Sequence, residues 1–259
     1  MILTLDVGNT NIKLGLFTGD ELVGSWKIGT DVRRTSDETI AIIKQLFRSN
    51  DIDEHKITGG IMSSVIPQLN YSLFHAIEYY FGFKLITVSA GIKTGLNIKY
   101  ESPKELGSDR IVNCVAALKK YGAPFILVDF GTATTYNAVN SKKEFVGGCI
   151  TAGIKTTLEA LCSHTAQLPR VELVVTPNVI ENTTRKAIQS GIIYGAIGQT
   201  KFLLEEIKKE LNAKDAKIIF TGGLSQLVTD KFNLHDYVDR ELSLEGLNIL
   251  YKLNTPCEK

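Results

Sequence analysis

Few cysteines and histidines occur in this sequence, and none of them shows the spacing of metal ligands or of a disulfide framework. The cysteines are Cys114, Cys149, Cys162 and Cys257, and the histidines are His55, His75, His164 and His235. Zinc sites and small disulfide-bonded domains need cysteines at short, repeated spacings. We therefore expect reduced thiols in a cytoplasmic protein, without a zinc site.

A strong excess of one charge is also absent, as is any long apolar run. The 259 residues include 29 Lys and Arg against 28 Asp and Glu, a formal net charge of +1. Nucleic-acid-binding domains are typically much more basic, and a membrane-spanning helix needs ~18 or more apolar residues. Asp6 interrupts the N-terminal apolar run, so no signal peptide is expected. With 44% hydrophobic residues, the chain should form a large core and bind small molecules rather than nucleic acid or membrane.

The most informative stretch is a strand and turn that occurs twice. Its copies are Ile2-Leu3-Thr4-Leu5-Asp6-Val7-Gly8-Asn9-Thr10-Asn11 and Phe125-Ile126-Leu127-Val128-Asp129-Phe130-Gly131-Thr132-Ala133-Thr134. The aspartate at the strand end can hold a metal ion, and the glycine lets backbone N–H groups approach phosphate oxygens. One such Asp-x-Gly could be an ordinary turn. Two copies, 123 positions apart in 259 residues, predict two similar halves that share one phosphate-bearing ligand.

The predicted elements follow a similar order in both halves. In the first half, strands are expected over 2–5, 13–18, 22–28, 57–63 and 84–89, with helices from Ser36 and over 68–81. In the second half, strands are expected over 125–129, 134–139, 144–148 and 217–221, with helices over 154–163, 181–211 and 243–253. We therefore predict an α/β fold of two β-β-β-α-β-α halves with mixed central sheets, covering residues 1–115 and 116–259.

Further motifs lie between and behind the two turns. They are Ser63-Ser64-Val65-Ile66-Pro67, Pro103-Lys104-Glu105-Leu106-Gly107-Ser108-Asp109-Arg110, Gly147-Gly148, Thr165-Ala166-Gln167-Leu168-Pro169 and Thr221-Gly222-Gly223. With the duplicated turns, they resemble the type III pantothenate kinase family of the actin, sugar-kinase and Hsp70 ATPase superfamily. The most specific feature is Leu-Gly-x-Asp-Arg, about 20 residues ahead of Asp-x-Gly-Thr-Ala-Thr. The family pattern has Pro-Gly where this chain has Ala152-Gly153.

The resemblance implies an actin-like ATPase fold with two RNase H-like halves. ATP would be bound by one residue of the second turn and by most residues of the first turn and the strand that follows it. These residues are Thr132 and Asp6, Val7, Gly8, Asn9, Thr10, Asn11, Ile12 and Lys13. Asp6 would approach the Mg²⁺ of Mg-ATP. Asp129 would hold a monovalent cation, K⁺ or NH4⁺, with a plain turn carboxylate as the alternative. Neither GxxxxGK[ST] nor His-Arg-Asp occurs, which argues against P-loop and protein-kinase sites.

Asp109 is the expected catalytic base. It opens a helix whose apolar side is formed by Ile111, Val112, Val115 and Leu118. An aspartate at a helix start often only complements the helix dipole, but the Leu-Gly-x-Asp-Arg pattern favours the catalytic role. The dipole is expected to lower the pKa of Asp109. Phosphoryl transfer depends more on the position of the base than on its basicity, so this does not exclude the role.

The resemblance also implies a pantothenate site formed by Tyr100, Gly107, Ser108, Asp109, Arg110 and Thr184. Arg110 would pair with the pantothenate carboxylate, with a surface ion pair as the alternative. Tyr100 could instead be a core or rim residue, and Thr184 a plain helix-start residue. The predicted activity is ATP-dependent phosphorylation of pantothenate to 4'-phosphopantothenate, the first step of coenzyme A biosynthesis. A sugar kinase or other small-molecule kinase of the superfamily, or a nucleotide-switched regulatory protein with this fold, is the alternative.

A helix around residues 191–204 predicts a homodimer. Gly191, Gly195 and Gly198 recur at three- and four-residue spacing and leave a smooth strip. The apolar residues of the same helix spread further around it than one core-facing stripe requires; they are Ile192, Ile193, Ile197, Phe202 and Leu203. The same helix of a second subunit would cover this surface. The alternative is that the last helix of the chain covers it.

Overall fold

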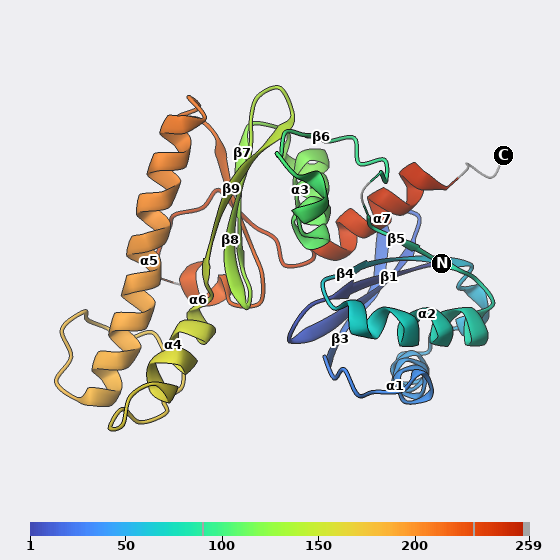
Figure 1. Ribbon diagram of the computed structural model, residues 1–259, viewed down its shortest axis with the longest axis horizontal. Coiled ribbons are helices and arrows are strands. Elements are labelled where there is room, and N and C mark those ends of the chain that lie inside the picture. The colour runs from blue at the N-terminus through green and yellow to red at the C-terminus, as the bar shows by residue number, and fades with distance from the viewer. Residues whose placement is uncertain (90, 230, 256–259) are drawn as a thin grey trace. The chain divides into compact units, whose positions relative to one another are not determined.

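The computed structural model describes residues 1–89, 91–229 and 231–255. Its chain divides into two compact units, which Figure 1 shows with their elements labelled. Unit 1 comprises residues 1–95, 101–119 and the segment from 241 onward, and unit 2 comprises residues 96–100 and 120–240. Each unit has its own sheet, so each is described by itself.

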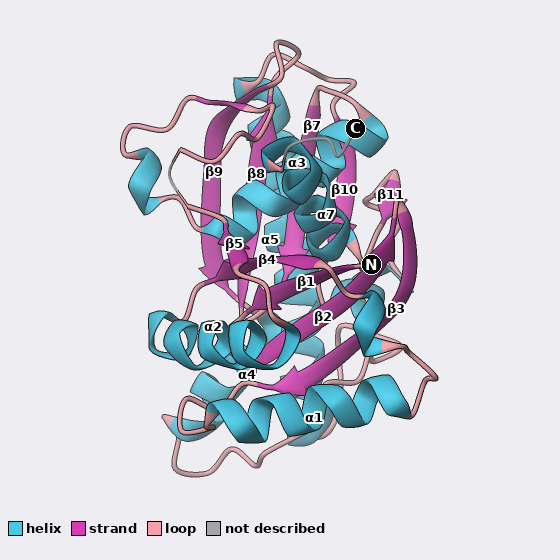
Figure 2. Ribbon diagram, turned by 90° about the vertical axis from the view of Figure 1, so that its right-hand side faces the viewer, coloured by secondary structure: helices cyan, strands magenta, loops and turns pink. Residues whose placement is uncertain are grey.

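Unit 1 is built on a five-stranded sheet (Figure 2). Its strands are β1 (Ile2–Val7), β2 (Asn11–Thr18), β3 (Glu21–Gly29), β4 (Gly59–Ser64) and β5 (Leu85–Thr87), in the order β3-β2-β1-β4-β5. The first three strands are antiparallel, whereas β4 and β5 run parallel to β1. All five predicted strands of the first half are therefore confirmed, with ends that shift by one or two residues.

Helices cover both faces of this sheet. The helices α1 (Ser36–Arg48) and α2 (Pro67–Phe81) pack their apolar sides on Leu3, Leu5 and Leu14 of one face. The opposite face contacts α7 (Leu242–Asn254), as Figures 1 and 2 show. Helix α3 (Ser108–Tyr121) and two short 3₁₀ turns, Glu54–Lys56 and Pro103–Glu105, complete the unit.

The start of α1 corrects one prediction. Thr35, and not Ser36, is the N-cap, because its hydroxyl accepts a hydrogen bond from the N–H of Glu38. The Glu38 carboxylate in turn accepts one from the N–H of Thr35. This reciprocal capping box needs an acidic residue three positions after the cap. Of the two candidates, Thr35 has one and Ser36 does not.

Unit 2 repeats the same strand order. Its strands are β6 (Asn97–Ile98), β7 (Phe125–Phe130), β8 (Ala133–Val139), β9 (Glu144–Ala152), β10 (Lys217–Thr221) and β11 (Tyr237–Val238). They lie in the order β11-β10-β7-β8-β9-β6, with an antiparallel β7-β8-β9 meander and with β10 and β11 parallel to β7. Apart from the extra edge strand β6, this is the order of unit 1, so the predicted repetition and mixed sheets are confirmed. The two-residue strands β6 and β11 were too short for a periodic pattern to predict.

One face of the second sheet carries the helices of unit 2. These are α4 (Ile154–Ser163), α5 (Thr184–Glu210) and the short α6 (Ser225–Thr229). Ile154 of α4 and Ile193, Ile197 and Leu204 of α5 are buried together with Val128 of β7. The long helix predicted over 181–211 is confirmed, but Ile193 and Ile197 belong to the core of the unit.

Helix α7 belongs to unit 1, which differs from the predicted division into residues 1–115 and 116–259. Four of its leucines are fully buried, Leu242, Leu244, Leu247 and Leu250. Gly246 lies so close to the carbonyl of Val112 in α3 that any side chain there would collide with it. The burial of this apolar stripe on the first sheet depends on contacts between residues more than 100 positions apart, which no local pattern contains.

Candidate active site

The first phosphate turn places two opposite charges on the α7 side of the first sheet. Alternation along β1 directs Leu5 and Val7 into the core beneath α1 and α2 and Asp6 to the other face. Asp6 pairs with Lys13 across β2 and with Ser63 across β4. The Lys13 ammonium lies 3.9 Å from the Asp6 carboxylate and 3.4 Å from the hydroxyl of Ser243 in α7. The strand end thus presents a carboxylate with a lysine beside it.

The turn between β1 and β2 is held in shape by Thr30, a residue that the sequence analysis missed. The Thr30 hydroxyl donates a 2.6 Å hydrogen bond to the carbonyl of Gly8, and its N–H donates to the carbonyl of Thr10. The side chains of Asn9, Thr10 and Asn11 are exposed, whereas those of Val7 and Ile12 are buried in the core. Val7 and Ile12 can therefore offer a phosphate only their backbone groups.

The Leu-Gly-x-Asp-Arg segment forms the first turn of α3, and its geometry explains the glycine. The Asp109 carboxylate folds back over Gly107, where any side chain would collide with it. The carbonyl of Gly107 accepts a 3.1 Å hydrogen bond from the N–H of Arg110. Ser108 is tied to the end of β4, because its hydroxyl accepts a 2.8 Å hydrogen bond from the hydroxyl of Ser63. Unit 1 thus brings Gly107, Ser108, Asp109 and Arg110 to the strand end that carries Asp6.

The pKa of Asp109 is raised above its ordinary value, and the expectation that the helix start lowers it is wrong. Burial of the carboxylate is the largest cause, and the nearby negative charge of Asp6 is the next. The N–H and the guanidinium of Arg110 act in the opposite direction but do not cancel these two effects. Asp109 is therefore a carboxylate that accepts a proton more readily than an exposed aspartate does.

Arg110 and Cys114 lie in the same buried part of α3. Only 6% of Arg110 is exposed, so the alternative of a surface ion pair does not fit. Burial raises the pKa of the Cys114 thiol to about 12, so this cysteine stays protonated and is not a reactive nucleophile. Cys114, Cys149 and Cys162 are free thiols; Cys257 lies outside the described residues.

The second turn repeats the register of the first with different neighbours. Asp129 of β7 pairs with Thr135 and Thr221, the positions that Lys13 and Ser63 occupy beside Asp6. A side chain at Gly222 would collide with the Asp129 carboxylate and with the backbone of Phe130. Gly222 also has a φ of +93°, which favours glycine. The Thr-Gly-Gly motif therefore lets the chain after β10 pass directly over Asp129.

Thr132 lies at the tip of the second turn, and the Ala152-Gly153 segment supports it. Its side chain is exposed, and its carbonyl accepts hydrogen bonds from the N–H of Gly153 at 3.0 Å and the hydroxyl of Thr156 at 2.7 Å. A side chain at Gly153 would collide with the carbonyls of Gly131 and Thr132. The glycine is therefore what this geometry requires, and alanine can replace the proline that precedes it in the family pattern.

The two remaining substrate candidates lie in unit 2, on elements other than the strand that carries Asp129. Tyr100 packs against Phe145 at the β6 edge of the sheet, with ring centroids 6.0 Å apart. Thr184 is the first residue of α5 and is exposed, while the neighbouring Thr183 provides the N-cap. Tyr100 thus has the packing of a residue at the sheet edge, and Thr184 stands at an exposed helix start.

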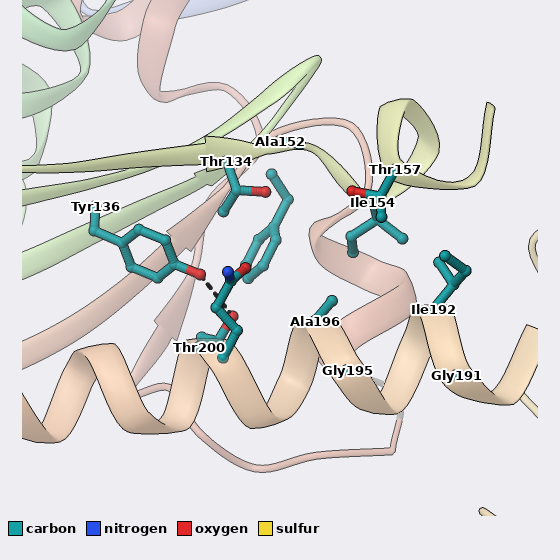
Figure 3. Close-up of a pocket in the computed structure, with 12 residues that line it drawn as sticks. Thr134, Tyr136, Ala152, Ile154, Thr157, Gly191, Ile192, Gly195, Ala196 and Thr200 are labelled. Carbon is teal, nitrogen blue, oxygen red and sulfur yellow. Dashed lines mark hydrogen bonds between the residues drawn. The ribbon is translucent and has the colours of Figure 1, made fainter. Parts of the chain in front are cut away.

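Unit 2 also contains a cavity of about 210 Å³ that the sequence did not reveal (Figure 3). It lies between β8, the end of β9, α4 and α5, and none of the twelve described residues that line it is charged. Tyr136 reaches across it to α5, where its hydroxyl lies 2.9 Å from that of Thr200. Gly191 and Gly195 form part of the wall on α5. A lining without charged side chains favours uncharged groups in this cavity.

Within the described ranges, no three His, Cys, Asp or Glu residues come together to form a metal site. This is compatible with Mg²⁺ that accompanies a nucleotide, because such an ion is held by one or two carboxylates together with phosphates and water. Asp6 is a carboxylate of that kind. No described helix is long and apolar enough to cross a membrane.

The raised pKa of Asp109 predicts that Asp109→Asn stabilises the protein at pH 7, because the amide removes the cost of burying a charge. An unfolded aspartate has a pKa of about 3.9. Below that pH the carboxyl is neutral in both states, and the wild type loses stability as the pH rises through the folded pKa. Urea unfolding should show a variant advantage at pH 7 that shrinks toward pH 3.5.

Asp20→Asn is the matched control, because Asp20 is an exposed residue of a surface turn that forms an ion pair with Lys252. It should change stability little at either pH. An Asp109→Asn protein that is less stable than the wild type at pH 7 would contradict the burial argument.

The fold of this chain is similar to the folds of several proteins of known structure. A Campylobacter jejuni protein named as a Baf family transcriptional activator has a TM-score of 0.59 and 22% identity, over 97% of this chain and 98% of that one. A Sinorhizobium meliloti protein named as a 2-dehydro-3-deoxygalactonokinase has a TM-score of 0.57 and 11% identity, over 100% and 98%. EutJ of Carboxydothermus hydrogenoformans, an ethanolamine utilization protein, has a TM-score of 0.54 and 13% identity, over 96% and 89%. At these identities the structures show the fold alone, and it is the predicted actin-like ATPase fold.

The family comparison reaches further than the fold. The model of the type III pantothenate kinase family matches residues 2–206. That range contains both Asp-x-Gly turns and the Leu-Gly-x-Asp-Arg segment. The chain belongs to the type III pantothenate kinase family.

Proposed function

We propose that the face of unit 1 that carries Asp6 and Asp109 is where the hydroxyl of pantothenate receives the phosphoryl group of ATP. The family phosphorylates pantothenate to 4'-phosphopantothenate in the first step of coenzyme A biosynthesis. The observation that carries the proposal is the buried Asp109 carboxylate, whose pKa is raised by burial and by the charge of Asp6. The helix dipole does not require this burial of the carboxylate, because an exposed acid at the start of α3 would complement the dipole equally well.

Each group on this face has one part in the transfer. Asp109 accepts the proton of the acceptor hydroxyl, whose oxygen attacks the γ-phosphorus while the bond to the ADP oxygen breaks. Arg110 is buried beside it and would pair with the carboxylate of pantothenate. Lys13 and the backbone N–H groups of the first turn would hold the phosphates, and Asp6 would hold the Mg²⁺ of Mg-ATP. On this face, the positive charge that neutralises the phosphates would thus come from Lys13 and the Mg²⁺.

Four residues of unit 2 would also take part in binding ATP, the cation and pantothenate. Thr132 has an exposed hydroxyl on a turn whose backbone is fixed by Gly153, which suits a phosphate contact. Asp129 would hold K⁺ or NH4⁺ near that turn, and Tyr100 and Thr184 would contact pantothenate. These four roles rest on the family motifs. Since both substrates are metabolites, we also place the protein in the cytoplasm.

The alternatives carry less support. A sugar kinase of the superfamily would share the two turns, but the family match over residues 2–206 favours pantothenate as acceptor. A nucleotide-switched regulatory protein has no use for a proton acceptor at the start of α3. The buried Asp109 therefore favours an enzyme.

We also propose that the protein is a homodimer formed through α5. Gly191 and Gly195 border the cavity of unit 2, but Gly198 does not line it, and a side chain added at Gly198 would meet nothing within 4 Å, so packing within the described chain does not explain this helix glycine. Glycine inside a helix costs about 1 kcal/mol relative to alanine. Phe202 on the same helix is 61% exposed. A second copy of α5 that packs closely on this face would account for both features.

Asp109→Asn should leave the KM for ATP nearly unchanged and lower kcat by about 10²-fold or more, the usual effect of losing a general base. The amide keeps the shape of the side chain and cannot accept the proton. A coupled assay for ADP with ATP and pantothenate measures both constants, and Asp20→Asn serves as the control at an exposed site. A variant with wild-type turnover would refute the role of Asp109.

The proposed cation site predicts that the enzyme is active in K⁺ or NH4⁺ and poorly active in Na⁺, which prefers a tighter cage of oxygens. Asp129→Ala should reduce kcat by about 10²-fold, the effect of removing one charge stabiliser beside the transferred group. The rates should be compared at constant ionic strength as Na⁺ replaces K⁺. Equal rates in all three salts would show that Asp129 is only a turn residue.

The dimer predicts a solution mass of twice 28.5 kDa by light scattering at micromolar concentration. Phe202→Glu should reduce the mass to that of the monomer without unfolding the unit, because Phe202 is exposed. Ile197 is unsuitable for this test, since it is buried in the core. Tyr79→Glu on α2 is the control, because Tyr79 is also exposed, at 73%, but lies on unit 1. A wild-type mass near 28.5 kDa would contradict the dimer.

A further inference from the structure

The Ser63-Ser64-Val65-Ile66-Pro67 segment has no part in the roles assigned so far. It joins the end of β4 to α2, and its first residue, Ser63, is only 1% exposed. A buried hydroxyl in a strand costs free energy unless it is hydrogen-bonded, and valine or isoleucine would suit a buried strand better. A serine at this position therefore needs an explanation from its surroundings.

Ser63 lies between the two carboxylates of the site. In the parallel pairing of β1 with β4 it stands opposite Asp6, so both side chains project from the same face of the sheet. Its hydroxyl donates a 2.8 Å hydrogen bond to the hydroxyl of Ser108, the first residue of α3 and the neighbour of Asp109. The Ser108 hydroxyl in turn donates to the carbonyl of Ser64 at 3.4 Å. This relay of two hydroxyls joins the strand beside Asp6 to the helix turn that carries Asp109.

The neighbouring serine makes only local contacts with its side chain. The Ser64 hydroxyl accepts a 3.1 Å hydrogen bond from the N–H of Ile66 and lies 3.3 Å from the carbonyl of the same residue. These bonds shape the turn that leads into α2, on the side of the sheet away from Asp109. The two adjacent serines are chemically identical, but their side chains stabilise different parts of the structure. Ser63 contacts the first turn of α3, and Ser64 contacts the turn that leads into α2.

We propose that Ser63 is a positioning residue, which fixes the Asp109 carboxylate relative to Asp6 through the hydroxyl of Ser108. The proposal rests on the role of Asp109 as the base. The separation of the two carboxylates controls both the alignment of the base with the acceptor hydroxyl and the strength of the repulsion that raises the pKa of Asp109. The first turn of a helix alone would hold the distance between the two carboxylates loosely, because helix ends fray. The two hydrogen bonds between Ser108 and the buried strand β4 hold this distance more firmly.

Ser63→Ala tests the proposal through two kinetic readouts. Without the donor, the first turn of α3 can relax away from β4, so kcat should fall roughly 10-fold to 10²-fold while the KM for ATP stays unchanged. The acidic limb of the pH profile of kcat/KM should move to lower pH, because weaker repulsion from Asp6 lets the pKa of Asp109 fall. Ionisation of pantothenate is common to all variants, so a difference between profiles belongs to the protein.

Ser64→Ala is the matched control, because it removes a hydroxyl from the adjacent position without touching the relay. It is expected to keep the wild-type kcat and acidic limb, even if it lowers stability. Ser63→Cys puts a slightly larger side chain with a weaker donor at this position and should show the same direction of change, which covers the case in which the alanine variant does not fold.

The outcomes separate this proposal from the function on which it rests. If Asp109→Asn is inactive but both Ser63 variants keep the wild-type kcat and acidic limb, the positioning role is refuted and the base remains. Equal losses in Ser63→Ala and Ser64→Ala, with an unmoved acidic limb, would show a purely structural role and also refute it. Full turnover of Asp109→Asn would instead refute the base itself.

Discussion

The repulsion between two carboxylates on one face of the first sheet is the constraint on which the site depends. Asp6 lies at the end of a central strand and Asp109 at the start of a helix, and the pKa of Asp109 is raised first by burial of its carboxylate and then by the charge of Asp6. Such a pair is unfavourable on its own, and in the proposed function it would become useful because Mg²⁺ and phosphates would lie beside Asp6. The fold tolerates the pair because Lys13 lies next to Asp6 and Arg110 next to Asp109. A stability cost at the active site is common where catalysis needs a perturbed group.

The duplicated hairpin gives two strand ends with the same backbone and different chemistry. In unit 1 the aspartate is paired in register with a lysine and a serine, and in unit 2 with two threonines. The first end therefore carries both signs of charge, whereas the second offers hydroxyls and the tight Gly222 turn against its carboxylate. This asymmetry suits a metal-bound, phosphate-handling end and a second end that supplies neutral contacts and a cation site. The asymmetry comes from the different residues that flank Asp6 and Asp129, since the strand order is the same in both units.

Local patterns in the sequence predicted most of the elements and the two turns, because alternation and helical periodicity reflect short-range geometry. The bounds of α4 and β10 are those expected, and the motifs identified the family. What depends on distant contacts could not be predicted. Asp6 and Asp109 are more than 100 residues apart, so the sequence suggested only the helix dipole and gave the wrong direction for the pKa of Asp109. Three further features could not be predicted for the same reason, since each depends on contacts between residues far apart in the sequence. They are the place of α7 on the first sheet, the burial of Ile197 and the support of Gly8 by Thr30.

The coupling between Asp6 and Asp109 is the central feature of the proposed site. Titration of the aspartate carboxyl carbons by ¹³C NMR, with Asp109 assigned from the Asp109→Asn spectrum, measures it without reference to activity. We expect a pKa for Asp109 above the ordinary value of about 3.9 in the wild type, and a fall in that pKa in Asp6→Asn. An Asp109 pKa at or below the ordinary value, or one that does not move when the charge of Asp6 is removed, would contradict the account.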